Sequence, residues 1–142
     1  MKYLCLVIVD EKKLKALSKR DSQALDDVSM AYDDRLRQSG HFVAAQALEH
    51  VSTAATLRLR RGKVSVSDGP FAETKEQVGG FILIEAKDRN EAVELAAKIP
   101  ALRFGGVEVR PVKELVAAKQ PRSSRLSDHQ ALARPVSRRR RY

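Results

Sequence analysis

Residues 67–81 read SDGPFAETKEQVGGF, and the division of this stretch decides the strand order of the whole chain. Gly69 tolerates backbone angles that other residues avoid and Pro70 fixes the angle that follows, so the stretch begins with a turn. Gly79-Gly80 predicts a second break, after which Phe81–Ile84 reads as an apolar strand. A hairpin that only reverses direction needs about two to five residues. This longer and chemically mixed connection is therefore expected to do more than turn the chain.

Five further strands are predicted around this stretch from continuous or alternating apolar patterns, at Tyr3–Val9, Phe42–Leu48, Thr56–Arg60, Lys63–Ser67 and Val107–Val112. The two alternating runs are separated only by Arg61-Gly62, which predicts a tight hairpin with one face in water. The first predicted strand, Tyr3–Val9, is too short for a membrane helix, which needs about 20 residues. No small-residue cleavage site follows it, so it is read as a buried strand and not as a signal peptide.

Two helices are predicted between these strands. The first begins at a capping box, Ser18–Asp21, and ends at Gly40. Its apolar stripe has helical spacing and consists of Leu25, Val28, Tyr32 and Leu36. The second begins at Asp88 and is stopped by Pro100, with an apolar side made of Ala92, Val93, Leu95, Ala96 and Ile99.

The resulting order is β-α-β-ββ-β-α-β, which without the inserted hairpin is the split βαβ pattern of a ferredoxin-like α+β fold with an antiparallel sheet. Both helices would cover one face of the sheet and leave the other face apolar. A second copy of the same sheet is the simplest cover for that face, so a homodimer packed sheet to sheet is expected. The cleft of such a protein would lie between sheet and helices or between subunits.

The chain is expected to hold one domain, residues 1–113, followed by a basic extension, residues 114–142, that lies on the surface or is partly disordered. Within the extension, Glu114–Lys119 and Asp128–Ala133 are read as short helical segments. Residues 1–113 carry 19 Lys and Arg against 16 Asp and Glu, whereas residues 114–142 carry 8 against 2, so the extension supplies +6 of the net charge of +9. The single cysteine, Cys5, fits a reducing cytoplasm and is expected to be a small core residue.

The segment Asp68–Gln77 with Gly79–Phe81 closely resembles the DGPF-motif family of YCII-related proteins. The similarity extends over about residues 1–113 and includes the opening strand, Gly40–Val43, Lys63–Val66, Ile99–Ala101 and Val107–Val112. It implies a dimeric α/β barrel built from ferredoxin-like subunits. Members are mostly uncharacterised bacterial proteins, many of them encoded beside extracytoplasmic-function sigma factors.

The resemblance does not settle a reaction. Distant relatives with the same barrel include muconolactone isomerase and a chlorohydroquinone dehydrochlorinase, and smaller YCII relatives have a proposed His–Asp pair with the His on the first helix. Here the first helix contains no His, and Tyr32 is its nearest inward-facing polar residue. The proposed pair therefore does not transfer to this chain.

Asp68 and His41 are the candidate catalytic residues. Asp68 stands at a strand end beside a sharp turn, where it can either cap the turn through backbone N–H groups or act as a general base. His41 follows the first helix, where it can stabilise the helix dipole or serve as an acid/base partner. The candidate ligand-binding residues are Tyr32, Gly69, Pro70, Phe71, Thr74 and Lys75, with Phe71 as an apolar wall and Thr74 and Lys75 for an anionic group.

No metal-ligand spacing, phosphate-binding glycine loop or nucleophile elbow is found, so no metal and no cofactor is predicted. The Arg138–Arg141 run can contact phosphates, but it carries no recognised nucleic-acid motif, so nucleic acid is not an expected partner. The function expected is the binding or conversion of a small molecule in a cleft near the DGPF turn. The alternative is a non-catalytic accessory protein linked to an extracytoplasmic-function sigma factor.

Overall fold

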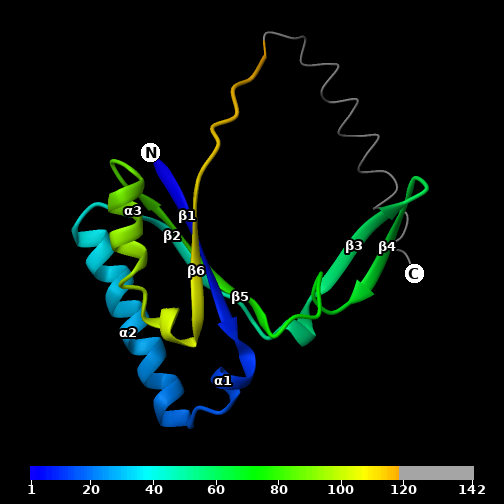
Figure 1. Ribbon diagram of the computed structural model, residues 1–142, viewed down its shortest axis with the longest axis horizontal. Coiled ribbons are helices and arrows are strands. Elements are labelled where there is room, and N and C mark those ends of the chain that lie inside the picture. The colour runs from blue at the N-terminus through cyan, green and yellow to red at the C-terminus, as the bar shows by residue number, and fades with distance from the viewer. Residues whose placement is uncertain (119–142) are drawn as a thin grey trace. The chain divides into compact units, whose positions relative to one another are not determined.

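The computed structural model describes residues 1–118 and divides the chain into two units (Figure 1). The first unit consists of Met1–Val51 and Ala72–Lys113, and the second includes Ser52–Phe71. Each unit is described by itself. In the described part of the chain, no helix is long and apolar enough to cross a membrane.

The first unit is built on a four-stranded antiparallel sheet with the order β2-β5-β1-β6. The strands are β1 (Lys2–Asp10), β2 (Phe42–Ala47), β5 (Glu76–Glu85) and β6 (Gly105–Pro111). Helices α2 (Lys19–Gln38) and α3 (Arg89–Ala96) lie together on one side of this sheet (Figure 1). This order confirms the predicted ferredoxin-like α+β fold, with β6 and its Pro111 at an edge.

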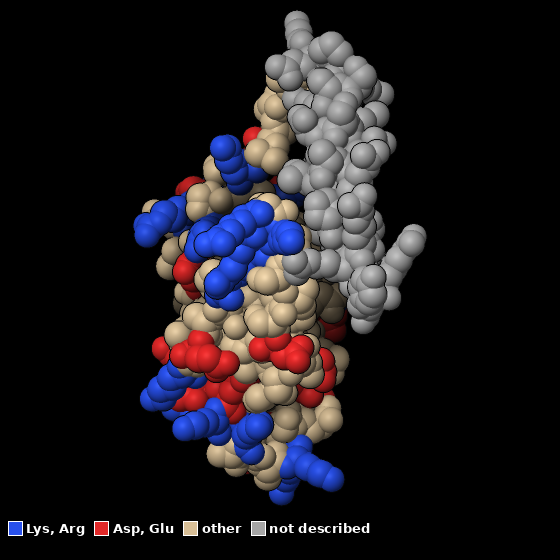
Figure 2. All heavy atoms as spheres, turned by 90° about the vertical axis from the view of Figure 1, so that its right-hand side faces the viewer, with Lys and Arg blue, Asp and Glu red and all other residues tan. Residues whose placement is uncertain are grey.

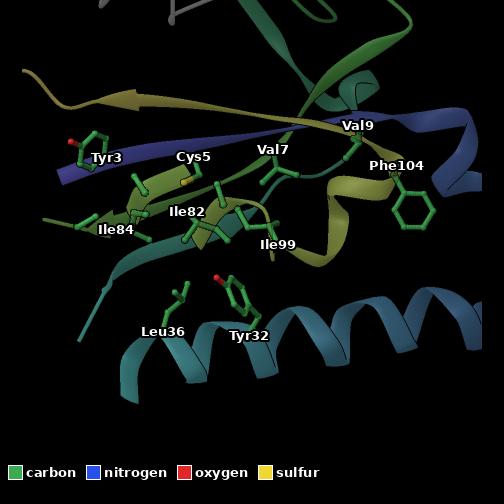
Figure 3. Close-up of a cluster of buried hydrophobic side chains, with 13 residues drawn as sticks. Tyr3, Cys5, Val7, Val9, Tyr32, Leu36, Ile82, Ile84, Ile99 and Phe104 are labelled. Atoms are coloured by element: carbon green, nitrogen blue, oxygen red, sulfur yellow. The ribbon is translucent and has the colours of Figure 1, made fainter. Parts of the chain in front are cut away.

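The core lies between the sheet and the two helices (Figure 3). Alternate residues of β1 point into it, and Tyr3, Cys5, Val7 and Val9 are all buried. Burial raises the pKa of the Cys5 thiol to about 11. The intervening residues of β1, including Leu4, Leu6 and Ile8, are half-buried and lie on the opposite face of the sheet from the helices.

Helix α2 has the predicted ends but a narrower buried stripe than predicted. The Ser18 hydroxyl accepts a hydrogen bond from the Asp21 backbone N–H at 3.0 Å, and Gly40 follows the helix at φ +80°. Tyr32 and Leu36 are buried and Leu25 packs against the core. Val28 was predicted to belong to this stripe, but it is 50% exposed and does not belong to the buried core.

The predicted break at Gly79-Gly80 is wrong, because both glycines lie inside β5. The pairing of β5 with β1 shifts register between Val7 and Ile8, and Gly79 is left as the extra residue of a bulge. A Cβ on Gly79 would lie 2.7 Å from Val9 Cγ2, and one on Gly80 would lie 2.8 Å from the Gln46 carbonyl oxygen. These glycines therefore permit close packing within the sheet and do not end a strand.

The inserted hairpin is confirmed as a separate two-stranded sheet of β3 (Ala55–Arg60) and β4 (Lys63–Asp68). Its turn residues, Arg61 and Gly62, have φ of +52° and +75°, as expected for a tight two-residue hairpin turn. Three short elements were not predicted: helix α1 (Glu11–Lys15) and 3₁₀ helices at Val51–Thr53 and Pro100–Phe104.

Two predictions about the later part of the chain need correction. Helix α3 ends at Ala96, so it stops before Pro100, and Val93 is 44% exposed although it was assigned to the buried side. Residues 112–118 have no regular secondary structure where Glu114–Lys119 was predicted to begin a helix. The helical segment predicted at Asp128–Ala133 lies outside the described residues.

Candidate functional site

A cavity of about 480 Å³ lies between α2 and the sheet in the first unit. Its helical wall is formed by Gln23, Asp26, Ser29, Met30 and Asp33. The spacing of the last four of these residues places them on one side of α2, because residues three, four and seven apart share a helix face. The cavity thus has a wall of polar side chains and one methionine that borders the buried core.

The opposite wall is formed by small and apolar residues. Ala45, Ala47 and Gly80 line the cavity from neighbouring strands, with Ala45 paired to Ile82 and Ala47 paired to Gly80. Ile99, Pro100 and Ala101 line the end of the cavity where α3 gives way to the following 3₁₀ helix. The small side chains of β2 and β5 leave space that larger strand residues would fill. The alanines of β2 are therefore what opens the cavity.

Asp33 is the ionisable group in this cavity whose pKa is perturbed. Partial burial raises the pKa of Asp33, the nearby Arg37 guanidinium lowers it, and the neighbouring Asp34 carboxylate raises it further. The net direction is upward, so Asp33 keeps its proton to a higher pH than an exposed aspartate. A carboxyl group of this kind can donate or accept a proton close to a bound molecule.

The predicted site residues Tyr32 and His41 hold helices together and do not line the cavity. The Tyr32 hydroxyl is buried and donates a 2.6 Å hydrogen bond to the Leu95 carbonyl oxygen, which joins α2 to the end of α3. His41 Nδ1 lies 2.7 Å from the Ser39 hydroxyl, and its Nε2 lies 3.3 Å from Glu91 Oε1. His41 therefore joins the end of α2 to the first turn of α3.

The DGPF turn belongs to the second unit. Gly69 has φ +104°, as its predicted role in the turn requires, and its N–H donates to the Ala54 carbonyl oxygen at 2.8 Å. The Thr56 hydroxyl donates to the Gly69 carbonyl oxygen, also at 2.8 Å. Among the described residues, no hydrogen bond reaches the Asp68 carboxylate, so the capping of this turn by Asp68 is not formed.

Phe71 and Arg58 form a contact of their own in the second unit. The Arg58 guanidinium lies over the Phe71 ring, 4.4 Å from its centroid, and donates to the Phe71 carbonyl oxygen at 2.9 Å. The Phe71 residue is 73% exposed. The predicted apolar wall is thus an exposed aromatic ring stacked against a cation.

Thr74 and Lys75 belong to the first unit and close the connection that leads into β5. The Thr74 hydroxyl donates to the Glu76 carbonyl oxygen at 2.7 Å, and Lys75 Nζ lies 3.7 Å from Asp10 Oδ2. Asp10 is 4% exposed and also accepts from the Lys12 backbone N–H at 3.0 Å. The motif lysine therefore pairs with a carboxylate that is buried at the end of β1.

A second pair, Glu11 with His50, lies at the same end of β1 and was missed from the sequence. His50 Nε2 lies 3.2 Å from Glu11 Oε1, and Glu11 Oε2 accepts from the Val51 backbone N–H at 3.3 Å. Glu11 and His50 are far apart in the sequence, so no local pattern marks this pair. No group of three or more residues able to hold a metal ion occurs in residues 1–118.

The sequence model of the YCII-related domain matches residues 1–116. The chain belongs to the YCII-related family. It is 37% identical over 115 residues to an uncharacterised protein of Rhizobium meliloti (strain 1021), and the match covers 79% of this chain and 92% of that protein. The family match includes the cavity residues and all of the DGPF stretch.

Among solved structures, the fold is similar to 5-chloro-2-hydroxyhydroquinone dehydrochlorinase from Burkholderia phenoliruptrix AC1100, in its complex with 2,5-dihydroxybenzoquinone. The TM-score is 0.47 at 18% sequence identity, and the match covers 81% of this chain and 96% of that chain.

Proposed function

We propose that this YCII-related protein binds and converts an apolar small molecule in the cavity between α2 and the sheet. The single observation that carries this proposal is the cavity itself, about 480 Å³ in volume and bounded by small and apolar residues on its sheet side. Ligand sites are concave, mostly apolar and furnished with a few polar groups that orient the ligand. The polar side of α2 supplies such groups.

Asp33 is the acid/base group in this proposal. It faces the cavity from the same helix side as Ser29 and Asp26, so a bound molecule would meet one perturbed carboxyl group and a hydroxyl together. Such a carboxyl group can remove a proton from a bound molecule or return it, whereas Ser29 and Gln23 can hold the ligand by hydrogen bonds. Reaction types that need only proton transfer are therefore the ones this site supports.

The proposal includes a homodimer. The sheet face opposite the helices carries Leu4, Leu6, Ile8, Phe81 and Leu83, all half-buried in the single chain. The hairpin adds Leu57, Leu59 and Val66, which are 52%, 66% and 57% exposed. An apolar surface of this kind is usually covered by a partner. A second copy of the same chain would cover it without any other protein. The cytoplasmic location and the link to a sigma factor stay predictions from the sequence.

The experiment is a thermal-shift screen of apolar and aromatic metabolites with hits measured by calorimetry. Ala47→Phe places a large side chain at the cavity wall, where Ala47 is exposed enough to accept it. Ligands that stabilise the wild type are expected to lose their effect on Ala47→Phe. Asp21→Asn is the control for Asp33→Asn, because Asp21 is exposed on the same helix and does not line the cavity.

A substrate found in this way should be converted by the Asp21→Asn protein at the wild-type rate. Loss of the Asp33 carboxyl group is expected to lower the rate by about 10²–10⁴-fold, the usual contribution of general acid/base catalysis. Ligands that stabilise the wild type and Ala47→Phe equally would show that the cavity is not the binding site.

A further inference from the structure

The inserted hairpin concentrates positive charge that the first unit lacks. Residues 1–51 and 72–113 carry 15 Lys and Arg and 15 Asp and Glu, so the first unit has no net charge. Residues 52–71 carry four cations and one carboxylate. Figure 2 shows Lys and Arg side chains gathered in groups on the face in view. The charge of the described chain is therefore a property of β3 and β4.

The register of the hairpin places these cations on one face. Arg58 pairs with Ser65, Arg60 with Lys63 and Thr56 with Ser67, and directly paired residues share a face of the ribbon. Asp68, the only carboxylate of residues 52–71, pairs with Ala55 and so falls on the opposite face with the leucines and valines. The first face thus consists of cations and hydroxyl groups alone.

The cations of this face are not neutralised. Among the described residues, no carboxylate forms an ion pair with Arg58, Arg60, Arg61 or Lys63. Within residues 1–118, Ser65 and Ser67 make only long hydrogen bonds to backbone carbonyls, at 3.4 and 3.5 Å, so their hydroxyl groups can turn to another acceptor. Cations and hydroxyl donors along a strand are the groups that contact phosphate oxygens.

An aromatic ring completes the surface. Phe71 is 73% exposed, and the Arg58 guanidinium covers one side of its ring at 4.4 Å from the centroid. An exposed ring held against a cation is a stacking platform for an unpaired base, whereas bases inside a duplex are already stacked and paired. This feature favours a single strand over a duplex or a lipid surface.

We propose that the cationic face of the β3–β4 hairpin, with Arg58, Arg60, Lys63 and the Phe71 ring, binds single-stranded nucleic acid through its phosphates and one stacked base. The prediction that nucleic acid is not a partner rested on the terminal arginine run alone. The pairing of β3 with β4 supplies a second set of cations and places them on one face. This binding is independent of the cavity beside α2.

The test is fluorescence anisotropy of the full chain with a labelled oligothymidylate of about 12 nucleotides, within the site sizes known for single-strand binding folds. Binding is measured between about 50 and 200 mM salt, because each phosphate contact to a single strand contributes about −0.7 to the slope of log K against log salt. Arg60→Gln with Lys63→Gln is expected to weaken binding and to reduce the slope by about 1.4. Lys12→Gln with Lys13→Gln removes the same charge from the first unit and should change neither quantity.

Phe71→Leu tests the stacking contact without a change of charge. It is expected to weaken single-strand binding by roughly tenfold and to leave the salt slope unchanged. The hairpin proposal is overturned if the oligonucleotide does not bind, if a matched duplex or phosphatidylglycerol vesicles bind more tightly, or if the Lys12/Lys13 variant loses as much affinity as the Arg60/Lys63 variant. Unchanged binding by the Arg60/Lys63 variant would assign the activity to the terminal arginines instead.

Discussion

Asp33 and Asp68 show how the position of a carboxyl group in the fold decides what it can do. Asp33 lies on the cavity side of α2, where burial raises its pKa. Asp68 is exposed at the end of β4 in the other unit. Asp68 is conspicuous in the sequence because it belongs to the DGPF motif. Asp33 stands among four other carboxylates of α2, and no local pattern distinguishes it as a site residue.

The raised pKa of Asp33 gives a prediction about the pH dependence of stability. The folded state holds the Asp33 proton to a higher pH than the unfolded chain does, so ionisation above the usual aspartate value of about 3.9 favours unfolding. Asp33→Asn is therefore expected to match the wild type in acid and to be equally or more stable at neutral pH. Melting temperatures of both proteins between about pH 3 and 8 check this, and a variant that is less stable only at neutral pH would contradict it.

The predicted roles of Asp68 are separated by Asp68→Asn. Because no hydrogen bond to this carboxylate is seen among the described residues, the substitution should change the free energy of unfolding by less than about 0.5 kcal/mol, as for most surface positions. If Asp68 is a general base, activity toward a substrate falls by about 10²–10⁴-fold while stability is retained. Equal ligand stabilisation and equal turnover in both proteins would remove Asp68 from the candidate site.

At the level of elements, the strand order and the helix ends could be predicted, but the role of the glycines could not. Ser18 and Gly40 predict the two ends of α2 correctly, because helix capping involves residues that are close together in the sequence. Gly79 and Gly80 were wrongly predicted to end a strand. Glycine is needed at these positions because Val9 and Gln46, which are distant in the sequence, pack closely against them. The cavity was missed for the same cause, since it depends on small residues of β2 lying opposite polar residues of α2.

Two adjacent glycines in β6 offer a matched test of close packing. A Cβ on Gly105 would overlap the backbone carbonyl of Ile8, whereas a Cβ on Gly106 would meet nothing within 4 Å. Gly105→Ala is therefore expected to destabilise the protein by about 1–3 kcal/mol, as overpacking does. Gly106→Ala should stay within about 0.5 kcal/mol of the wild type. Denaturant unfolding of the two variants measures both values, and equal stabilities would show that the pairing of β1 with β6 relaxes freely.

At the level of the whole molecule, apolar surface remains on two parts of the chain that no described residue covers. The open sheet face and the hairpin both present leucines and valines to solvent in the single chain. A hairpin of two strands is marginally stable alone, which supports the proposed homodimer. The homodimer stays a prediction that the sequence makes from the number of helices.

Light scattering at micromolar concentration is expected to give a dimer for the wild type. Leu6→Glu with Leu83→Glu places two charges on the open sheet face and should yield monomers or insoluble protein. Val28→Glu is the control, because Val28 is 50% exposed on α2 and away from that face. A wild-type monomer, or a dimer that survives the double substitution, would rule out the sheet-to-sheet contact.

The buried position of Cys5 allows opening of the fold to be measured by chemical labelling of its thiol. The only thiol of the protein lies 1% exposed in β1, between β5 and β6, with a pKa of about 11. An alkylating reagent attacks the thiolate, so labelling at neutral pH requires that the core between the sheet and the helices open around Cys5. The labelling rate under native conditions then reports how often the core opens at Cys5, without any engineered probe. Ligands of the cavity and a partner subunit should each slow that rate in proportion to the stability they add.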